Sequence, residues 1–280
     1  MLIQGSYYNY MKTILITGCS TGIGRCLADG LKAKNYSVIT TARKKEDIEA
    51  LNNAGFEAVM LDLADSNSIQ SAAETILAKA NGQLYGLVNN AAYGLTGAIE
   101  DLPIQALRDQ FETNVLGTQE LTNLIIPSMR KNNEGRIIQI SSVLGFVTMK
   151  YRGAYCASKY ALESLSDAMR YELANANIKV SLIEPGPIKS EFRNNVVTNF
   201  NKVIDKDKSI HADAYRKMES EVGKPVPFTL GPEAVLEKVI HALESEKPKA
   251  RYCVTFPTYL FTFLKRILPN FLMDKILVRV

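Results

Sequence analysis

The chain has 280 residues, of which 46% are hydrophobic and 22% are charged, and its formal net charge is +4. This is the composition of an ordinary globular protein, and the chain is long enough to bury a core without disulfides or a structural metal. The charge is not concentrated in one basic run, which argues against a nucleic-acid partner. No apolar run reaches the length needed to span a bilayer.

The sequence also gives no sign of a metal site, a secretory signal or a disulfide framework. The two histidines have no histidine or cysteine close by in the sequence, so we expect no metal site. Residues 1–10 have neither a basic start nor a sustained apolar segment, so we do not expect them to be a secretory signal. We expect a cytoplasmic protein in which residues 1–11 are an extension. The cysteines form no paired motif and should be free thiols in a reducing compartment: Cys19, Cys26, Cys156 and Cys253.

From residue 12 onward, short β-branched runs alternate with segments of helical periodicity. Strands are expected at residues 12–17, 36–41, 57–63, 84–90, 135–142, 178–186 and 250–256. Helices are expected at residues 22–34, from about 44, at 66–80, 103–131 and 154–176, and from Pro232. Continuous apolar strands between helices predict an α/β protein whose parallel sheet is covered on both faces. With right-handed crossovers this is a doubly wound, seven-stranded Rossmann fold, which we expect to form one domain over residues 12–255.

Two segments fall outside this alternation. Residues 190–228 are polar and mixed in charge, and they follow the sixth strand. Ligands of doubly wound sheets bind outside the carboxyl ends of the strands, so this insertion is placed to cover a substrate. Residues 256–280 form an apolar tail with interspersed Lys and Arg residues. We expect the tail to pack on its own domain or on a neighbouring subunit, and the less favoured alternative is peripheral contact with a membrane.

A glycine-rich segment, TGCSTGIG, follows the first strand and opens a helix. Gly18 would permit a tight turn, Gly22 would allow the backbone to approach a pyrophosphate, and Gly24 would let the helix pack near the sheet. The free N–H groups at the helix N-terminus would bind the phosphates, and Ser20 and Thr21 add hydroxyl donors. This context predicts a dinucleotide site, and the alternative is a turn without a ligand.

The end of the second strand indicates which dinucleotide is bound. Folds that bind NAD usually place an acidic residue there, which accepts hydrogen bonds from the ribose 2′-OH. Here Ala42 stands at that place and is followed by Arg43, Lys44 and Lys45. Because an arginine can bind a 2′-phosphate through two hydrogen bonds, we expect NADP(H) to be preferred over NAD(H), with Arg43 as the discriminating residue. The alternative is that these cations only begin a solvated helix.

Tyr155 and Lys159 lie four positions apart in the segment GAYCASKYALESL. On a helix this spacing puts both side chains on one face, so the ammonium group could lower the pKa of the phenol and favour general acid–base catalysis. The spacing alone is not decisive, because YNYMK near the N-terminus shares it without any sign of chemistry. Ser142, at the end of the fifth strand, could bind a substrate oxygen, whereas Ser141 should point to the other face of the sheet.

In this order the motifs resemble the standard subfamily of the short-chain dehydrogenases/reductases, over about residues 12–255. TGCSTGIG is similar to the family's glycine loop, and LDL, NNAA and PGPIKS are similar to its adenine, fourth-strand and nicotinamide segments. Two departures, Ala92 for a glycine and Ser190 for a threonine, should have little effect. To Gly18, Ser20, Thr21, Gly24 and Arg43 the resemblance adds these cofactor-binding residues: Ile23, Asp62, Leu63, Asn90, Ala91, Tyr155, Lys159, Pro185, Gly186, Ile188 and Ser190.

The resemblance also implies four catalytic residues, namely Asn114, Ser142, Tyr155 and Lys159. Tyr155 would protonate the carbonyl oxygen in reduction and accept the proton in oxidation, while Ser142 would bind the substrate oxygen. Lys159 would also bind the ribose hydroxyls of the nicotinamide nucleotide. Asn114 would hold a water molecule that links the lysine to solvent.

The motifs look more like those of hydroxysteroid and retinol dehydrogenases than like those of β-ketoacyl reductases. With the insertion and the apolar tail, this favours a lipophilic substrate. We therefore expect an NADP(H)-dependent oxidoreductase that interconverts a carbonyl and a primary or secondary alcohol on a steroid-, retinoid- or lipid-like molecule. Two alternatives are a sensor or scaffold that binds NADP(H) without chemistry, and a 3-oxoacyl reductase-like enzyme. The resemblance implies a homodimer or homotetramer.

Overall fold

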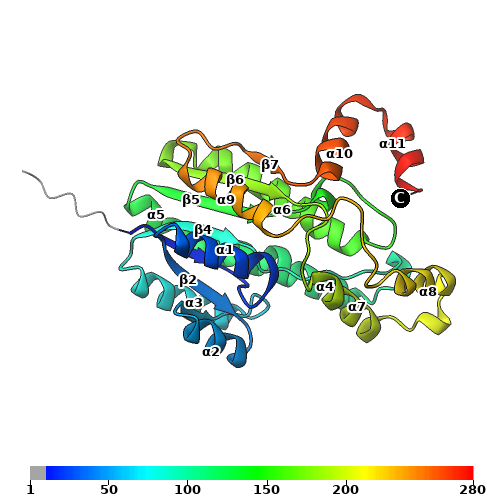
Figure 1. The fold of residues 1–280 in the computed structure, drawn as a ribbon, viewed down its shortest axis with the longest axis horizontal. Helices are drawn as coiled ribbons and strands as arrows, with labels where there is room; N and C mark the ends of the chain where they lie inside the picture. Colours follow the sequence, from blue (N-terminus) through cyan, green and yellow to red (C-terminus); the bar gives the residue numbers. More distant parts are fainter. Residues whose placement is uncertain (1–10, 280) are drawn as a thin grey trace, which may run out of the picture.

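Seven parallel strands form one sheet in the part of the chain that the structure, a computed structural model, describes, namely residues 11–279 (Figure 1). The expected extension lies outside the described residues, apart from Met11. The sheet order is β3-β2-β1-β4-β5-β6-β7, which confirms the predicted doubly wound fold. From β1 the chain adds β2 and β3 on one side of the sheet and then β4 to β7 on the other, so the topological switch point lies between β1 and β4. The strands are β1 (Thr13–Ile16), β2 (Ser37–Ala42), β3 (Glu57–Met60), β4 (Leu84–Asn89), β5 (Gly135–Ile140), β6 (Ile178–Glu184) and β7 (Arg251–Cys253).

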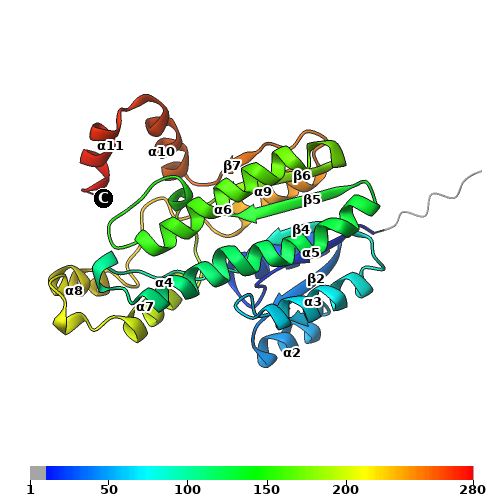
Figure 2. The ribbon, with the colours of Figure 1, turned by 180° about the vertical axis from the view of Figure 1, so that it is seen from behind.

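Helices cover both faces of this sheet. The α-helices are α1 (Gly22–Ala33), α2 (Lys45–Asn53), α3 (Ser66–Lys79), α4 (Ile104–Phe111), α5 (Thr118–Lys131), α6 (Gly153–Glu172), α7 (Phe192–Val203), α8 (Ala212–Ser220), α9 (Glu233–Glu244), α10 (Phe256–Ile267) and α11 (Asn270–Leu277). Short 3₁₀ turns are η1 (Ile99–Asp101), η3 (Val143–Gly145), η4 (Ala174–Ala176) and η5 (Lys206–Lys208). Helices α1 and α9 lie over the face seen in Figure 1, whereas α5 and α6 cover the opposite face, seen in Figure 2.

Each face of the sheet has its own hydrophobic core, because successive side chains of a strand point to opposite faces. In β1, Ile14 and Ile16 pack with residues of α1 and α9, whereas Leu15 packs with residues of α3 and α5. All three side chains are fully buried. Parallel strands covered on both sides need apolar residues at nearly every position, which explains why the strands are recognisable as continuous apolar runs.

The helix expected over residues 103–131 contains a break that its sequence pattern does not indicate. A π-helical turn, η2 (Glu112–Gly117), separates α4 from α5. The expectation of one regular helix is therefore wrong at this turn. A π turn inserts a residue without ending the helix, and such turns are frequent at functional sites. Asn114 lies in this turn and is buried.

The insertion and the tail follow the carboxyl ends of β6 and β7. Residues 190–228 form α7, η5 and α8, and the Asn199 side chain donates a hydrogen bond of 3.3 Å to the carbonyl oxygen of Gly94, in the loop after β4. The tail forms α10 and α11, in which Phe261 and Met273 are buried in a small core next to η3. One face of the tail thus packs on its own chain, in agreement with the favoured expectation.

Candidate active site and cofactor cleft

The turn between β1 and α1 has a conformation that requires glycine. Gly18 and Gly22 have φ angles of 70° and 59°, in the left-handed region. A Cβ atom on Gly18 would lie 2.9 Å from the Cα atom of Ala91, and one on Gly24 would lie 2.1 Å from the carbonyl oxygen of Gly18. The turn therefore leaves the first N–H groups of α1 without bulky neighbours, as a phosphate-binding helix N-terminus needs.

Asn90 and Thr17 fasten this turn to the end of β4. The Asn90 side-chain amide donates to the carbonyl oxygens of Thr17 at 2.9 Å and of Gly18 at 3.0 Å. The hydroxyl oxygen of Thr17 accepts from the backbone N–H groups of Asn90 and Ala91, both at 3.0 Å. Asn90 thus uses its amide donors to hold the turn, and Thr17 is a supporting residue that the motif did not single out. Ala92 has no positive φ, so it replaces glycine without strain.

Ser190 lies across the glycine turn from the other side. A Cβ atom on Gly22 would be 3.1 Å from the Cβ atom of Ser190, so the two residues are in direct contact. Both line an open cavity of about 830 Å³, together with Thr21, Lys189 and other residues of α1 and α9. The structure therefore brings the two predicted cofactor segments, at residues 17–24 and 185–190, next to each other.

The remaining predicted residues of the second segment support it from behind. The carbonyl oxygen of Pro185 accepts the N–H of Val143 at 2.8 Å, which joins this segment to the end of β5. Gly186 packs so closely on Thr255 that a Cβ atom would lie 2.1 Å from the threonine hydroxyl oxygen. The Ile188 side chain is buried in the core below α1 and α9. These residues fix the path of the segment that presents Ser190.

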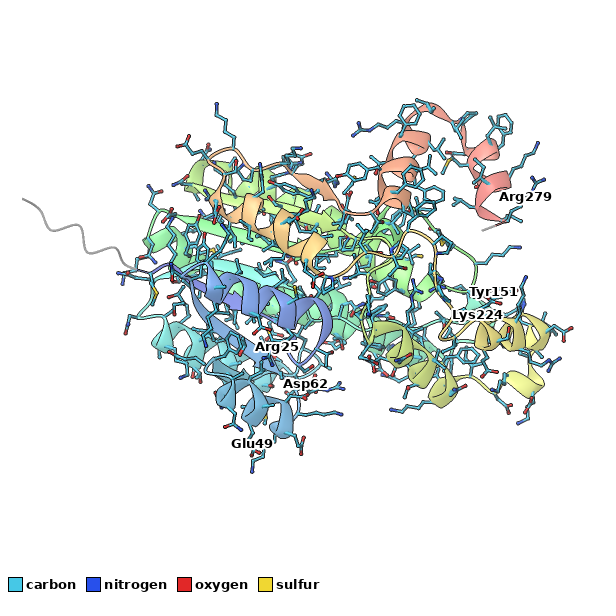
Figure 3. All side chains as sticks on the ribbon, in the orientation of Figure 1. Arg25, Glu49, Asp62, Tyr151, Lys224 and Arg279 are labelled. Carbon is cyan, nitrogen blue, oxygen red and sulfur yellow. The ribbon has the colours of Figure 1, made fainter. Side chains whose placement is uncertain are left out.

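The ends of β2 and β3 flank the glycine turn. The Gly18 N–H donates to the Thr41 hydroxyl oxygen at 3.3 Å, and Arg43 follows β2 as an exposed residue. The third strand ends at Met60, before the expected residue 63, so Asp62 and Leu63 belong to the following loop. Leu63 is buried, whereas Asp62 is partly exposed at this edge of the sheet (Figure 3).

This arrangement fits a nicotinamide dinucleotide. Ser20 and Thr21 are exposed at the start of α1, and the Thr21 side chain makes no capping hydrogen bond. Ile23 packs its side chain on the core, while its backbone N–H is one of those in the first turn that lack an intrahelical partner. Phosphates would bind at this helix end, and Arg43 supplies a cation near the place where a 2′-phosphate would lie.

Ser142 and Tyr155 lie together where β5 ends and α6 begins. The Ser142 hydroxyl interacts with the Tyr155 phenol and also accepts a hydrogen bond of 3.1 Å from the N–H of Leu144. Ser141 interacts with Glu163 instead. The two adjacent serines therefore have different neighbours on α6.

Lys159 is buried below Tyr155, with only 3% of its surface exposed. Its ammonium nitrogen lies 5.8 Å from the centre of the Tyr155 ring and donates a hydrogen bond of 2.8 Å to the carbonyl oxygen of Ile140. Burial lowers the pKa of Lys159 to about 8, and the nearby Glu163 carboxylate opposes this shift. The predicted pair does share one face of a helix.

The pKa of Tyr155 moves in the direction opposite to the one expected from the lysine. Burial raises this pKa, and the Ser142 hydroxyl opposes the shift by a smaller amount. The expectation of a lowered phenol pKa is therefore corrected, because burial disfavours the charged phenolate. Tyr155 thus keeps its proton at neutral pH and can act as a proton donor.

Asn114 fixes the loop after β4 to α6. Its side-chain oxygen accepts from the N–H of Tyr93 at 3.1 Å, and its amide nitrogen donates to the Tyr93 carbonyl at 2.9 Å and to the Ser158 hydroxyl at 3.2 Å. Ser158 in turn donates to the carbonyl oxygen of Tyr155 at 2.8 Å. Asn114 is therefore linked to the start of α6 through Ser158.

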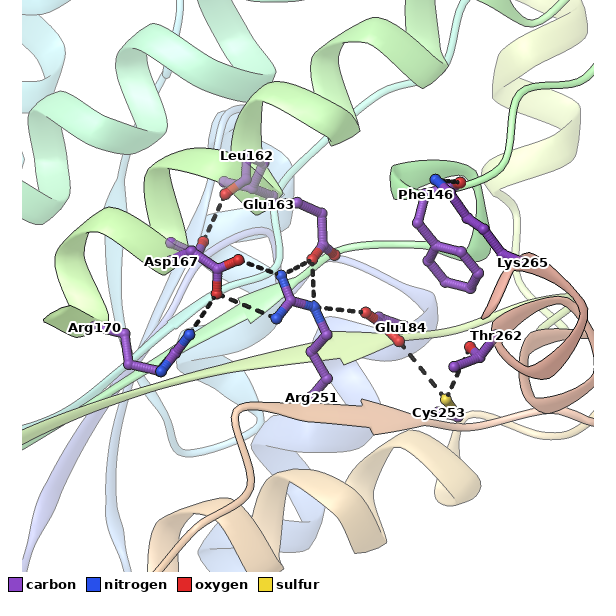
Figure 4. Close-up of polar contacts among 11 residues, drawn as sticks. Phe146, Leu162, Glu163, Asp167, Arg170, Glu184, Arg251, Cys253, Thr262 and Lys265 are labelled. Carbon is purple, nitrogen blue, oxygen red and sulfur yellow. Dashed lines mark hydrogen bonds and ion pairs between the residues drawn. The ribbon is translucent and has the colours of Figure 1, made fainter. Parts of the chain in front are cut away.

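A cluster of charged side chains around Arg251 was not predicted (Figure 4). Arg251, on β7, contacts Glu163 at 3.1 Å, Asp167 at 2.6 Å and Glu184 at 3.3 Å. Glu163 and Glu184 are almost fully buried, and burial raises the pKa of Glu184 to about 7. One arginine thus faces three carboxylates, of which Glu163 is also close to Lys159. No motif indicates the cluster, since its members come from separate elements.

Phe192 is a second residue that the motifs did not indicate. Its ring centre lies 5.6 Å from that of Tyr155, and a Cβ atom on Gly94 would meet the Phe192 ring at 2.8 Å. Phe192 opens α7, in the segment that the topology placed over the substrate. An aromatic side chain therefore flanks the phenol on the side of the insertion.

Comparison with known proteins agrees with this arrangement. The short chain dehydrogenase family model matches residues 12–200. The uncharacterized oxidoreductase YbbO of Escherichia coli (strain K12) is 44% identical over 95% of this chain and 94% of its own. The NADPH-dependent 3-dehydrocapnine reductase of Ornithobacterium rhinotracheale is 34% identical over 95% and 96%, and retinol dehydrogenase 8 of Homo sapiens is 31% identical over 86% and 80%. A solved short-chain dehydrogenase from Streptomyces avermitilis has a TM-score of 0.76 at 29% identity, over 93% of this chain and 94% of that one.

The family match includes the glycine turn and the tyrosine–lysine helix, and the relatives extend it over nearly the whole chain. The family predicted from the ordered motifs is confirmed, together with its fold. The chain belongs to the short-chain dehydrogenases/reductases and is an oxidoreductase of the class that acts on CH–OH groups.

Proposed function

We propose that the protein is an NADP(H)-dependent oxidoreductase that interconverts a carbonyl group and an alcohol on a lipophilic substrate, with Tyr155 as the acid and base. The observation that carries this proposal is the convergence of Ser142, Tyr155 and Lys159 beside the glycine turn. Ser142 and Tyr155 present two hydroxyl groups to one place, and Lys159 lies buried directly behind them. Two hydroxyls on one oxygen atom suit a carbonyl group that becomes an alkoxide.

In the proposed mechanism, the phenol of Tyr155 exchanges one proton with the substrate oxygen. The bound cofactor supplies hydride in reduction and accepts it in oxidation. In reduction, Ser142 holds the carbonyl oxygen by a hydrogen bond and Tyr155 transfers its phenolic proton to that oxygen as the carbon becomes tetrahedral. The resulting phenolate is stabilised by the Lys159 ammonium group, whose pKa of about 8 keeps it largely protonated at neutral pH. In oxidation the same phenolate would take the hydroxyl proton of the alcohol.

The preference for NADP(H) is part of this proposal and depends on Arg43. The residue is exposed directly after β2, and no acidic residue stands at the strand end to repel a 2′-phosphate. One relative carries NADPH dependence in its name. A charge-assisted hydrogen bond contributes about 1.5–3 kcal/mol, so Arg43→Asp should reduce the NADPH/NADH preference by roughly 10- to 100-fold. Lys45→Asp, at the first residue of α2, is the control. An unchanged NADPH/NADH preference in Arg43→Asp would show that Arg43 is not the discriminating residue.

A lipophilic substrate is supported by the apolar surroundings of Tyr155. Phe192 lies against its ring, and Tyr155 packs against the small core that contains Val143, Leu144 and Phe261. The named relatives act on retinol and on 3-dehydrocapnine by their names. The test is a screen of steroids, retinoids, quinones, short-chain aldehydes and 3-oxoacyl esters with NADPH and with NADH. Turnover of the apolar carbonyls would support the proposal, and turnover of short-chain aldehydes alone would contradict it.

We also propose that the enzyme works as a homodimer or homotetramer in the cytoplasm. All four cysteines are free thiols, as expected in a reducing compartment. Light scattering of the purified protein gives the assembly state, and a monomeric mass at micromolar concentration would contradict this part of the proposal.

A further inference from the structure

Helix α10 has apolar residues on two opposite faces, of which only one is covered. The inward face carries Phe261, 7% exposed, which packs with Val143, Leu144 and Val147 in the core next to η3. Five residues on the outward face are 38–60% exposed: Phe256, Tyr259, Leu260, Phe263 and Ile267. Their spacing of three or four residues places them in one stripe along the helix.

The apolar stripe continues onto neighbouring segments. Phe228, at the end of the insertion, is 57% exposed, and its ring centre lies 4.9 Å from that of Phe256. Phe271, on α11, is 61% exposed. Helices α10 and α11 project from one corner of the molecule in both views (Figures 1 and 2). Phe228 and the α10 stripe thus form one exposed apolar patch, and a patch of this kind marks an interaction surface.

Basic residues on α10 and α11 indicate what the stripe binds, although the Lys265 ammonium group donates to the carbonyl oxygen of Phe146. Four cations occur between residues 256 and 279, against the single acid Asp274: Lys265, Arg266, Lys275 and Arg279. Within residues 11–279 none of these four cations forms an ion pair. Arg279 lies at the far end of α11 (Figure 3). A second copy of this chain would bring like charges together, whereas an anionic lipid surface combines negative headgroups with an apolar interior.

The lengths of the helices determine how such a surface could be used. Helix α10 has 12 residues, and no helix within residues 11–279 is long and apolar enough to cross a bilayer. A short helix with an exposed apolar stripe and flanking cations lies in the plane of the interface. The inward face of the same helix belongs to the core against which Tyr155 packs, so a bilayer under α10 would lie close to the active site.

We propose that the outward stripe of α10, continued by Phe228 and Phe271, docks the protein peripherally on an anionic lipid bilayer. This goes beyond the oxidoreductase function, because docking needs neither the cofactor nor Tyr155. The stripe enters the headgroup region while Arg266, Lys275 and Arg279 contact the lipid phosphates. A lipophilic substrate dissolved in the bilayer would then reach the cleft without crossing water.

The experiment is sedimentation of the full chain with vesicles of phosphatidylcholine alone and of phosphatidylcholine mixed with phosphatidylglycerol. The wild type should bind the anionic vesicles and be released by high salt. Each buried apolar side chain contributes about a factor of ten in partitioning, so Phe263→Ser/Ile267→Ser should bind about 100-fold more weakly. Arg266→Glu should weaken binding by at least about fivefold. The matched control, Ile104→Ser/Ile210→Ser, removes two exposed isoleucines outside the stripe and should bind as the wild type does.

Three results would overturn the proposal. The wild type could stay in the supernatant with anionic vesicles, or the stripe variant could bind as tightly as the control. Light scattering could also show that the wild type is a dimer and the stripe variant a monomer, which would assign the stripe to a second copy of the chain. Carbonyl reduction by the stripe variant without vesicles is measured in parallel, and its retention separates a failure of docking from a failure of the oxidoreductase function.

Discussion

The cofactor side and the substrate side of the cleft are built from different materials. Around the glycine turn, the cofactor would bind mainly to backbone groups. Thr17 and Asn90 hold these groups in place with four hydrogen bonds of 2.9–3.0 Å. Around Tyr155, side chains of α7 and α10 supply an apolar wall that continues to the surface. The first side leaves little freedom in sequence, because a single added Cβ atom would clash. The second side tolerates exchange of one apolar residue for another, which is how related enzymes could share a cofactor and differ in substrate.

The largest effect on the cofactor side is expected from Gly24→Ala. Its Cβ atom would lie 2.1 Å from the Gly18 carbonyl oxygen and 2.5 Å from the Asn90 amide nitrogen, so the turn must move. Because a displacement of about 1 Å can change a rate or affinity about 100-fold, we expect NADPH to bind about 100-fold more weakly in a fluorescence titration. Gly82→Ala is the control for the strain of replacing a glycine outside the turn, since Gly82 has a φ of 67° but no atom lies within 4 Å of its added Cβ. Equal NADPH affinity in the two variants would show that the turn is not the cofactor site.

On the substrate side, Phe192→Ala should act on the substrate and not on the cofactor. The variant removes the ring that lies 5.6 Å from the Tyr155 ring, and with it apolar contact area in the cleft. Losing a contact of this size reduces affinity by about tenfold, so KM for an apolar carbonyl should rise about tenfold while the Kd for NADPH stays constant. If the affinities of the variant for NADPH and for the substrate fell equally, Phe192 would not belong to a separate substrate side.

A smaller effect is expected from the charges behind Lys159. The pKa of Lys159 is about 8, and the negative charge of Glu163 holds it up against burial. Below this pKa the ammonium group supports Tyr155, so kcat/KM for reduction should fall as the pH rises through it. Glu163→Gln removes the charge that raises the pKa, so the fall should begin at a lower pH. Rates measured over about pH 6–9.5 test this, with the exposed Glu172→Gln as control, and coincident profiles would exclude the coupling.

Much of the cofactor side was predictable from the sequence because its residues are close together in local motifs. The turn from Thr17 to Gly24 is a continuous segment, and Tyr155 and Lys159 share one helix. The π turn that carries Asn114 was missed because its residues have ordinary helix propensities, while Asn114 bonds to Tyr93 and Ser158, which are far away in the sequence. The Arg251 cluster joins α6, β6 and β7, which no local pattern connects.

The direction of the Tyr155 pKa could not be predicted from sequence either. Spacing on a helix predicts which side chains are neighbours, but burial depends on everything that packs around them. Lys159 lies near Tyr155 as predicted, but burial of the phenol raises the pKa of Tyr155. The same holds for the outward stripe of α10. The sequence shows that the tail is apolar, but only the fold shows which apolar residues of α10 are buried and which are exposed.

The most direct test of the central claim is turnover by Tyr155→Phe, compared with Tyr160→Phe on the same helix. Tyr155 lies beside Ser142, whereas Tyr160 is 37% exposed and close to Lys265. We expect Tyr155→Phe to bind NADPH with unchanged affinity and to reduce carbonyls about 10²- to 10⁴-fold more slowly, because a positioned general acid contributes a factor of this size. Tyr160→Phe should keep the wild-type rate. A Tyr155→Phe variant that retains a rate close to that of Tyr160→Phe would contradict the assignment of Tyr155 as the proton donor.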